Sequence, residues 1–157
     1  MDTYKDTIIY IDMDGVMCNY AKGYAEGLKR NPHQPYPQSE FGFFTRLEPV
    51  EDAIETINWL REKFTVYALT RPSVKNIMCY SEKAAWIRDH FDDEMLENLI
   101  ICCNKSLVKG DFLIDDMTDH GQTEFEGIHL HFGTTDFPNW KEIKEYFEEV
   151  LEEEYDF

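Results

Sequence analysis

Apolar runs and helically spaced apolar residues alternate along this chain. Short runs rich in β-branched and aromatic residues predict buried strands at residues 7–12, 64–69, 99–102, 112–114 and 127–132. Apolar residues three or four positions apart predict amphipathic helices over residues 17–30, from Val50 through Leu60, from Ser81 to Phe91, and from Pro138 through Leu151. Strands that alternate with helices predict an α/β fold, a Rossmann-like doubly wound parallel sheet.

The first strand ends in two carboxylates and a glycine, Asp12, Asp14 and Gly15. Glycine allows the backbone to turn sharply away from the sheet, so both carboxylates can enter one pocket. Open α/β sheets build their sites at this carboxyl edge. Two crowded acids repel each other unless a cation or a shared proton lies between them. An isolated Asp-x-Asp-Gly is as readily an acid-rich turn, so the other strand ends decide between the two readings.

Polar side chains follow the other strands at the same edge. Thr70 and Arg71 follow the second strand, Lys105 comes just after the third, and Asp115 and Asp116 end the fourth. All these ends converge if the strands are parallel. Carboxylate oxygens suit Mg²⁺, while a hydroxyl and an ammonium suit phosphoryl oxygens. The sequence therefore predicts a magnesium-assisted phosphate site.

Composition narrows the class of protein further. The chain has 157 residues, 43% of them hydrophobic and 15% aromatic, which indicates one folded domain with a substantial core. A net charge of −17 disfavours binding to an extended nucleic acid. The four cysteines lack metal-site spacing, and neither a signal peptide nor a membrane-length apolar run is found. We therefore expect reduced thiols, no membrane insertion and a cytoplasmic location. His129 and His131 flank Leu130 on one face of a strand, where a structural role is favoured over zinc binding.

Several motifs together resemble a known family. D-M-D-G-V, L-T-R-P, N-K-S-L and L-I-D-D are similar to motifs one to four of the haloacid dehalogenase (HAD) superfamily. Gly-Phe-Phe at 42–44, Tyr-Ser-Glu-Lys-Ala-Ala-Trp at 80–86 and the segment 105–116 resemble the 5'(3')-deoxyribonucleotidase family. The likeness extends from Ile8 to about Asp119.

The resemblance implies a single HAD-like domain over residues 1–157. Its core would comprise about residues 1–16 and 47–157, with a small helical cap over about 17–46 inserted after the first strand. This insertion is shorter than is usual for the family. The chain also departs from the family at Arg71, where relatives tend to carry a small residue, and at Cys103, where relatives can carry an arginine.

Roles for the acids follow from the resemblance. Asp12 would attack phosphorus and form an aspartyl-phosphate, and Asp14 would serve as the general acid and base. Mg²⁺ would be held by Asp12, by the backbone carbonyl of Asp14, and by Asp116 with Asp115 close by.

Roles for substrate-binding residues follow in the same way. Thr70 and Lys105 would hold phosphoryl oxygens, with Arg71 beside them. Lys83 is expected to add a second positive charge, and the alternative is a lysine in solvent on a helix. The predicted partner is a small phosphate ester, a nucleoside monophosphate whose base stacks on Phe43 and Phe44. Homodimer formation is compatible with this prediction.

Other functions stay open on the sequence. A phosphatase for sugar phosphates or for nucleic-acid 3'-phosphates would use the same motifs. A phospho-acceptor receiver domain also gathers acids, Thr and Lys, but its acid pair ends the first strand, whereas here the pair comes last. A non-catalytic metal-binding module would have no use for Lys105 and Thr70 beside both Asp12 and Asp14.

Overall fold

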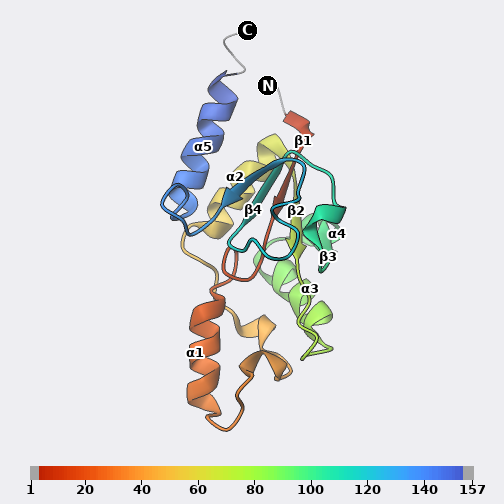
Figure 1. Ribbon diagram of the computed structural model, residues 1–157, viewed down its shortest axis with the longest axis vertical. Helices are drawn as coiled ribbons and strands as arrows, with labels where there is room; N and C mark the ends of the chain where they lie inside the picture. Colours follow the sequence, from red (N-terminus) through yellow and green to blue (C-terminus); the bar gives the residue numbers. More distant parts are fainter. Residues whose placement is uncertain (1–3, 154–157) are drawn as a thin grey trace.

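A five-stranded parallel sheet forms the centre of the molecule, which is described by a computed structural model covering residues 4–153. The strand order is β3-β2-β1-β4-β5, and every neighbouring pair is parallel (Figure 1). The strands are β1 (Tyr4–Ile11), β2 (Phe64–Thr70), β3 (Leu99–Ile101), β4 (Phe112–Asp115) and β5 (Ile128–His131). The predicted Rossmann-like parallel sheet is confirmed.

Five α-helices and three short 3₁₀ segments complete the fold. The α-helices are α1 (Tyr20–Arg30), α2 (Ala53–Lys63), α3 (Cys79–His90), α4 (Asp93–Glu97) and α5 (Trp140–Glu153). The 3₁₀ segments are η1 (Pro37–Ser39), η2 (Phe44–Arg46) and η3 (Lys105–Leu107). In the described part of the chain, no helix is long and apolar enough to span a membrane.

The two faces of the sheet are covered differently. On one face Ile9 packs into a large core with Ile57 of α2, Trp86 of α3 and Phe147 of α5. On the other face a small cluster around Tyr10 contains strand and loop residues, and none of its members within residues 4–153 comes from an α-helix. A doubly wound sheet is expected to carry helices on both faces, but within residues 4–153 the helices cover one face only. The connections over residues 102–111 and 116–127 contain no α-helix, and their lengths are close to the shortest that a crossover helix needs.

Three boundaries differ from the predicted ones. β1 begins at Tyr4, three residues before the strand predicted at 7–12, because Tyr4 pairs with Phe64 before a shift in register. The helix predicted from residue 17 begins at Tyr20. The backbone N–H groups of residues 16–18 donate to the carbonyl of Met13 in a turn, and Asn19 caps the helix. The one-turn helix α4 was not predicted.

The segment 20–46 forms a lobe beyond the carboxyl edge of the sheet, at the bottom of Figure 1. Hydrogen bonds fasten it to α3 and to the loop after β2. The buried carboxylate of Glu82 accepts from the backbone N–H of Gly42 and, at 2.8 Å, from Nδ2 of Asn76. The same Asn76 amide donates to the carbonyl of Glu40 at 3.2 Å.

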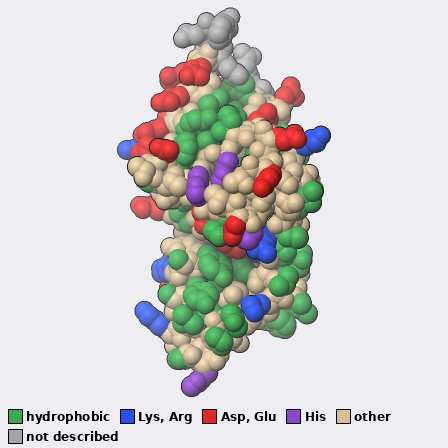
Figure 2. Space-filling view, viewed as in Figure 1, with side chains coloured by type: hydrophobic (Ala, Val, Ile, Leu, Met, Phe, Trp, Pro, Cys, Tyr) green, Lys and Arg blue, Asp and Glu red, His purple; other side chains and the backbone are tan. Residues whose placement is uncertain are grey.

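Charge is distributed unevenly over the visible surface. Figure 2 shows acidic side chains gathered over the upper part, where α5 and the sheet lie. The lower part presents mainly apolar side chains with scattered lysines and arginines. On this face of a protein with a net charge of −17, the acidic side chains thus lie mainly away from the lobe.

Candidate active site

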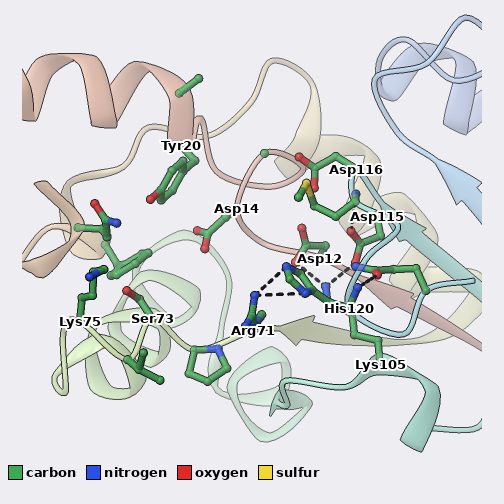
Figure 3. A pocket seen from close by; sticks show the side chains of 18 residues that line it. Asp12, Asp14, Tyr20, Arg71, Ser73, Lys75, Lys105, Asp115, Asp116 and His120 are labelled. Carbon is green, nitrogen blue, oxygen red and sulfur yellow. Dashed lines mark hydrogen bonds and ion pairs between the residues drawn. The ribbon is translucent and has the colours of Figure 1, made fainter. Parts of the chain in front are cut away.

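A cavity of about 510 Å³ opens where the strand ends meet the lobe (Figure 3). Asp12, Lys105, Asp115 and Asp116 line one end of it. Its size lies in the range typical of small-molecule sites. The strand ends converge there because all five strands are parallel and share one carboxyl edge.

Three carboxylates at this end form one tight group. One oxygen from each of Asp12, Asp115 and Asp116 lies within 4.8 Å of the other two. The buried ammonium of Lys105 donates to Asp12 Oδ1 at 2.8 Å and to Asp115 Oδ2. The backbone N–H of Asp12 donates to the carbonyl of Ile114 at 2.9 Å, which fixes the end of β1 against β4.

Burial controls the protonation of this group. Loss of solvent raises the pKa of Asp12 well above its ordinary value, although Lys105 opposes the shift. Burial likewise raises the pKa of Asp116. Burial alone would lower the pKa of Lys105, but the carboxylates of Asp12 and Asp115 outweigh it and raise that pKa. The ammonium therefore stays charged, and Asp12 and Asp115 share it.

The remaining acid oxygens fit a divalent metal. Oδ1 of Asp116 and Oδ1 of Asp14 are buried, and neither has a hydrogen-bond partner within residues 4–153. Unpaired buried carboxylate oxygens are costly unless a cation reaches them. Gly15 permits the arrangement, because it has a positive φ of 84° and any Cβ there would collide with the carboxylate of Asp116. Hard oxygen ligands of this kind suit Mg²⁺.

Lys83 is the centre of a second buried cluster. Its Nζ donates to Asp14 Oδ2 at 2.9 Å, to Thr70 Oγ1 at 2.6 Å and to the carbonyl of Arg71 at 2.7 Å. It also lies 5.0 Å from the centroid of the Phe44 ring. Three acceptors match the three protons of an ammonium. The alternative of a lysine in solvent is wrong, since Lys83 is completely buried.

Three residues expected at the substrate, Thr70, Phe43 and Lys83, do not line the cavity. Thr70 is fully buried behind Asp14, where its hydroxyl accepts from Lys83. Phe43 lies in the core, with its ring edge-on to Phe44 at 5.0 Å. Phe44 does line the cavity, so of the two phenylalanines in the Gly-Phe-Phe motif only the second can contact a ligand there.

Arg71 lines the cavity as expected, and its partner was not predicted. Its Nη1 lies 2.7 Å from Nε2 of His120, which comes from the loop after β4 (Figure 3). Tyr20 from α1 faces the same space. Burial and nearby Asp14 raise the pKa of Tyr20 to about 12, so its hydroxyl stays protonated. Periodicity gave no signal for His120, because it lies in an irregular loop.

His129 and His131 have the structural role favoured from the sequence. Nε2 of His129 donates to the carbonyl of Asp115, and Nε2 of His131 to the carbonyl of Asp116, both at 3.0 Å. The two rings stack with centroids 5.3 Å apart. These bonds fix the backbone that carries two of the clustered carboxylates.

Known proteins resemble this chain over most of its length. The family described as "5' nucleotidase, deoxy (Pyrimidine), cytosolic type C protein" matches residues 33–141. A provisionally named 5'(3')-deoxyribonucleotidase of Vibrio phage KVP40 is 32% identical over 142 residues, 88% of this chain and 83% of that protein. The human cytosolic-type 5'(3')-deoxyribonucleotidase is 28% identical, covering 74% of each chain. The Bacillus subtilis 5'(3')-deoxyribonucleotidase is 24% identical, covering 92% of this chain and 84% of its own.

Proposed function

The chain belongs to the 5'(3')-deoxyribonucleotidase family, and we propose that it is a phosphatase that hydrolyses deoxynucleoside monophosphates with the help of Mg²⁺. The observation that carries the proposal is the pairing of Asp12 with Lys105 beside two further acids, at the end of a cavity lined also by Phe44. A buried nucleophile, a fixed ammonium and an aromatic wall are what cleavage of a nucleotide phosphate requires.

Asp12 is the nucleophile of this proposal. Lys105 holds its Oδ1, which leaves Oδ2 to attack phosphorus. The Asp12 oxygen–phosphorus bond forms while the ester oxygen–phosphorus bond breaks, and the leaving alkoxide takes a proton from Asp14. In the second step water attacks the aspartyl-phosphate and gives a proton to Asp14, which releases inorganic phosphate and restores Asp12.

Lys83 sets the position of Asp14 in both steps. It grips one oxygen of that carboxylate at 2.9 Å, so the other oxygen faces the reacting groups. Thr70 and the carbonyl of Arg71 hold the ammonium in turn. The predicted contact of Thr70 with a phosphoryl oxygen is thus replaced in our proposal by an indirect role through Lys83.

Asp12, Asp115, Asp116 and the backbone carbonyl of Asp14 would hold Mg²⁺. When bound, the metal supplies positive charge that neutralises the phosphoryl oxygens and the clustered carboxylates. Lys105 adds a positive charge from the protein itself beside Asp12. Arg71 and His120, which contact each other, line the same cavity.

The lobe acts as the cap in this proposal. Phe44 and Tyr20 give it an aromatic surface toward the cavity, and stacking of a base on an aromatic ring is worth about 1–3 kcal/mol. An apolar wall disfavours an added 2'-hydroxyl by only about a hundredfold, so ribonucleotides are expected as slow substrates. A cytoplasmic location and a homodimer stay predictions from the sequence.

A panel of phosphate esters tests the function. We expect kcat/KM for deoxyuridine and thymidine monophosphates to exceed that for uridine monophosphate, with a sugar phosphate slowest, and EDTA to abolish all four activities. A sugar phosphate that outperforms every nucleotide would overturn the deoxyribonucleotidase assignment and leave a phosphatase of another specificity.

A further inference from the structure

Three buried side-chain atoms within residues 4–153 have no hydrogen-bond partner, and the residues that carry them all line one cavity. They are Oδ1 of Asp14, Oδ1 of Asp116 and Oε1 of Gln38. Buried polar atoms in folded proteins are almost always paired, so an unpaired one in a cavity wall is a candidate contact point for a ligand or an ordered water. The proposed reaction accounts for the two acids. It leaves Gln38 without a role.

Gln38 belongs to the lobe, at the end of the cavity away from the clustered acids. It lies in η1, two residues after Tyr36, whose ring centroid is 3.9 Å from Nζ of Lys75. Figure 3 places Lys75 and Ser73 at one end of the cavity and Asp115, Asp116 and Lys105 at the other. A ligand whose phosphate lies against the acids therefore extends its other end toward Gln38.

The side chain of Gln38 suits an uncharged partner with mixed polarity. A primary amide offers an oxygen acceptor and an NH₂ donor side by side, and rotation by half a turn exchanges them. The hydrogen-bonding edge of a nucleobase presents a donor beside an acceptor and pairs with such an amide through two bonds. Within residues 4–153 the amide oxygen of Gln38 has no hydrogen-bond partner, and the nearby carboxylate of Glu40 is already bonded to Arg30 at 3.4 Å and Asn31 at 3.2 Å.

We propose that Gln38 determines specificity by binding the hydrogen-bonding edge of the substrate's base. The base lies near Phe44 and Tyr20, and the amide of Gln38 pairs with its edge in the plane of the ring. This inference rests on the proposed deoxyribonucleotidase function and adds the residue that distinguishes a nucleotide from a phosphate ester without a base.

The test compares Gln38→Met with Gln34→Met. Methionine keeps the length of the side chain and removes its polar atoms. Gln34 lies in the same lobe and does not line the cavity; its Oε1 accepts from the backbone N–H of Tyr36 at 3.1 Å, so its replacement controls for loss of a lobe hydrogen bond away from the ligand. The readouts are the inhibition constants of free deoxyuridine and of inorganic phosphate, with kcat and KM for deoxyuridine monophosphate.

We expect Gln38→Met to raise the inhibition constant of deoxyuridine about tenfold, the cost of roughly one hydrogen bond to a buried group. The constant for inorganic phosphate should change less than twofold, because phosphate binds at the other end. KM for the nucleotide should rise with kcat nearly constant, as expected when uniform binding is lost. Gln34→Met should match the wild type in every constant.

Three results would overturn the inference. One is an unchanged deoxyuridine constant in Gln38→Met, and another is an equal rise for deoxyuridine and phosphate. The third is a wild-type enzyme that deoxyuridine does not inhibit although it hydrolyses the nucleotide. A wild-type protein that hydrolyses no nucleotide would instead refute the proposed function, so the two failures are distinguishable.

Discussion

The two ends of the cavity are built in opposite ways. At the carboxyl edge, the side chains of Asp12, Lys105 and Asp115 are at most 8% exposed and are linked by ion pairs. At the lobe end, Lys75 is exposed and Gln38 has no hydrogen bond to the described chain. We refer to the first group, with Asp116, as the acid floor and to the second, with Phe44 and Tyr20, as the lobe wall.

This difference separates chemistry from recognition. The acid floor is organised before substrate arrives, so little reorganisation is needed as charge develops in the transition state. The lobe wall keeps polar groups available, and two of its residues, Gln38 and Phe44, come from a segment (31–46) whose backbone is irregular apart from two short 3₁₀ turns. Perturbing the floor should therefore change kcat most strongly, whereas perturbing the wall should change KM and selectivity.

Replacing Asp12 by Asn should have the largest effect. We expect kcat to fall by at least about a thousandfold, because members of a catalytic unit fail together. The free energy of unfolding of the metal-free protein should stay level or rise, since burial raises the pKa of Asp12 and its charge is disfavoured in the folded state. Asp6→Asn, an exposed acid on the same strand, is the matched control. A variant that keeps a tenth of the wild-type rate would contradict the nucleophile assignment.

Lys83→Met comes next in expected size. The change removes the ammonium that Asp14 and Thr70 share, so we expect kcat to fall about a hundredfold with a smaller change in KM. Steady-state kinetics on deoxyuridine monophosphate measure both constants, and Lys29→Met on the exposed end of α1 serves as the control. A tenfold rise in KM at constant kcat would show that Lys83 belongs functionally to the lobe wall instead.

His131→Leu should sharpen the comparison with a smaller effect. The variant loses the hydrogen bond to the carbonyl of Asp116, which fixes the backbone of the acid floor. Replacing a residue that orients metal ligands typically lowers metal affinity about tenfold to a hundredfold. Calorimetric titration with Mg²⁺ should show weaker binding for this variant and unchanged binding for His33→Leu in the lobe. Equal affinities for wild type and His131→Leu would confine the histidine to a packing role.

The acid floor could be predicted from the sequence because its residues end strands. A buried apolar run gives the strand, a parallel sheet brings the ends together, and Asp12 with Asp115 and Asp116 then meets Lys105. Lys83 also matched a motif, but only the structure showed that it is buried against Asp14.

The lobe wall could not be predicted in the same way. Gln38 lies in a segment without periodicity, where the path of the chain depends on long-range contacts such as those of Glu82. His120, in the loop after β4, was missed for the same lack of periodicity. Phe43 and Phe44 are adjacent in sequence, and no local pattern shows that only the second lines the cavity. Alternation of strands and helices predicts helical cover on both faces of the sheet, whereas within residues 4–153 the second face carries none, because both connections that cross it lack an α-helix.

Capture of the covalent intermediate tests the central claim, that Asp12 in the acid floor attacks phosphorus. Wild-type protein mixed with a deoxynucleoside monophosphate and Mg²⁺ is quenched in acid during turnover, and its peptides are analysed by mass spectrometry. We predict a phosphorylated peptide that contains Asp12, with the phosphate on that residue and no such peptide from Asp12→Asn. Continued turnover without phosphate on Asp12, or phosphate on another residue that disappears on chase at the catalytic rate, would contradict the account.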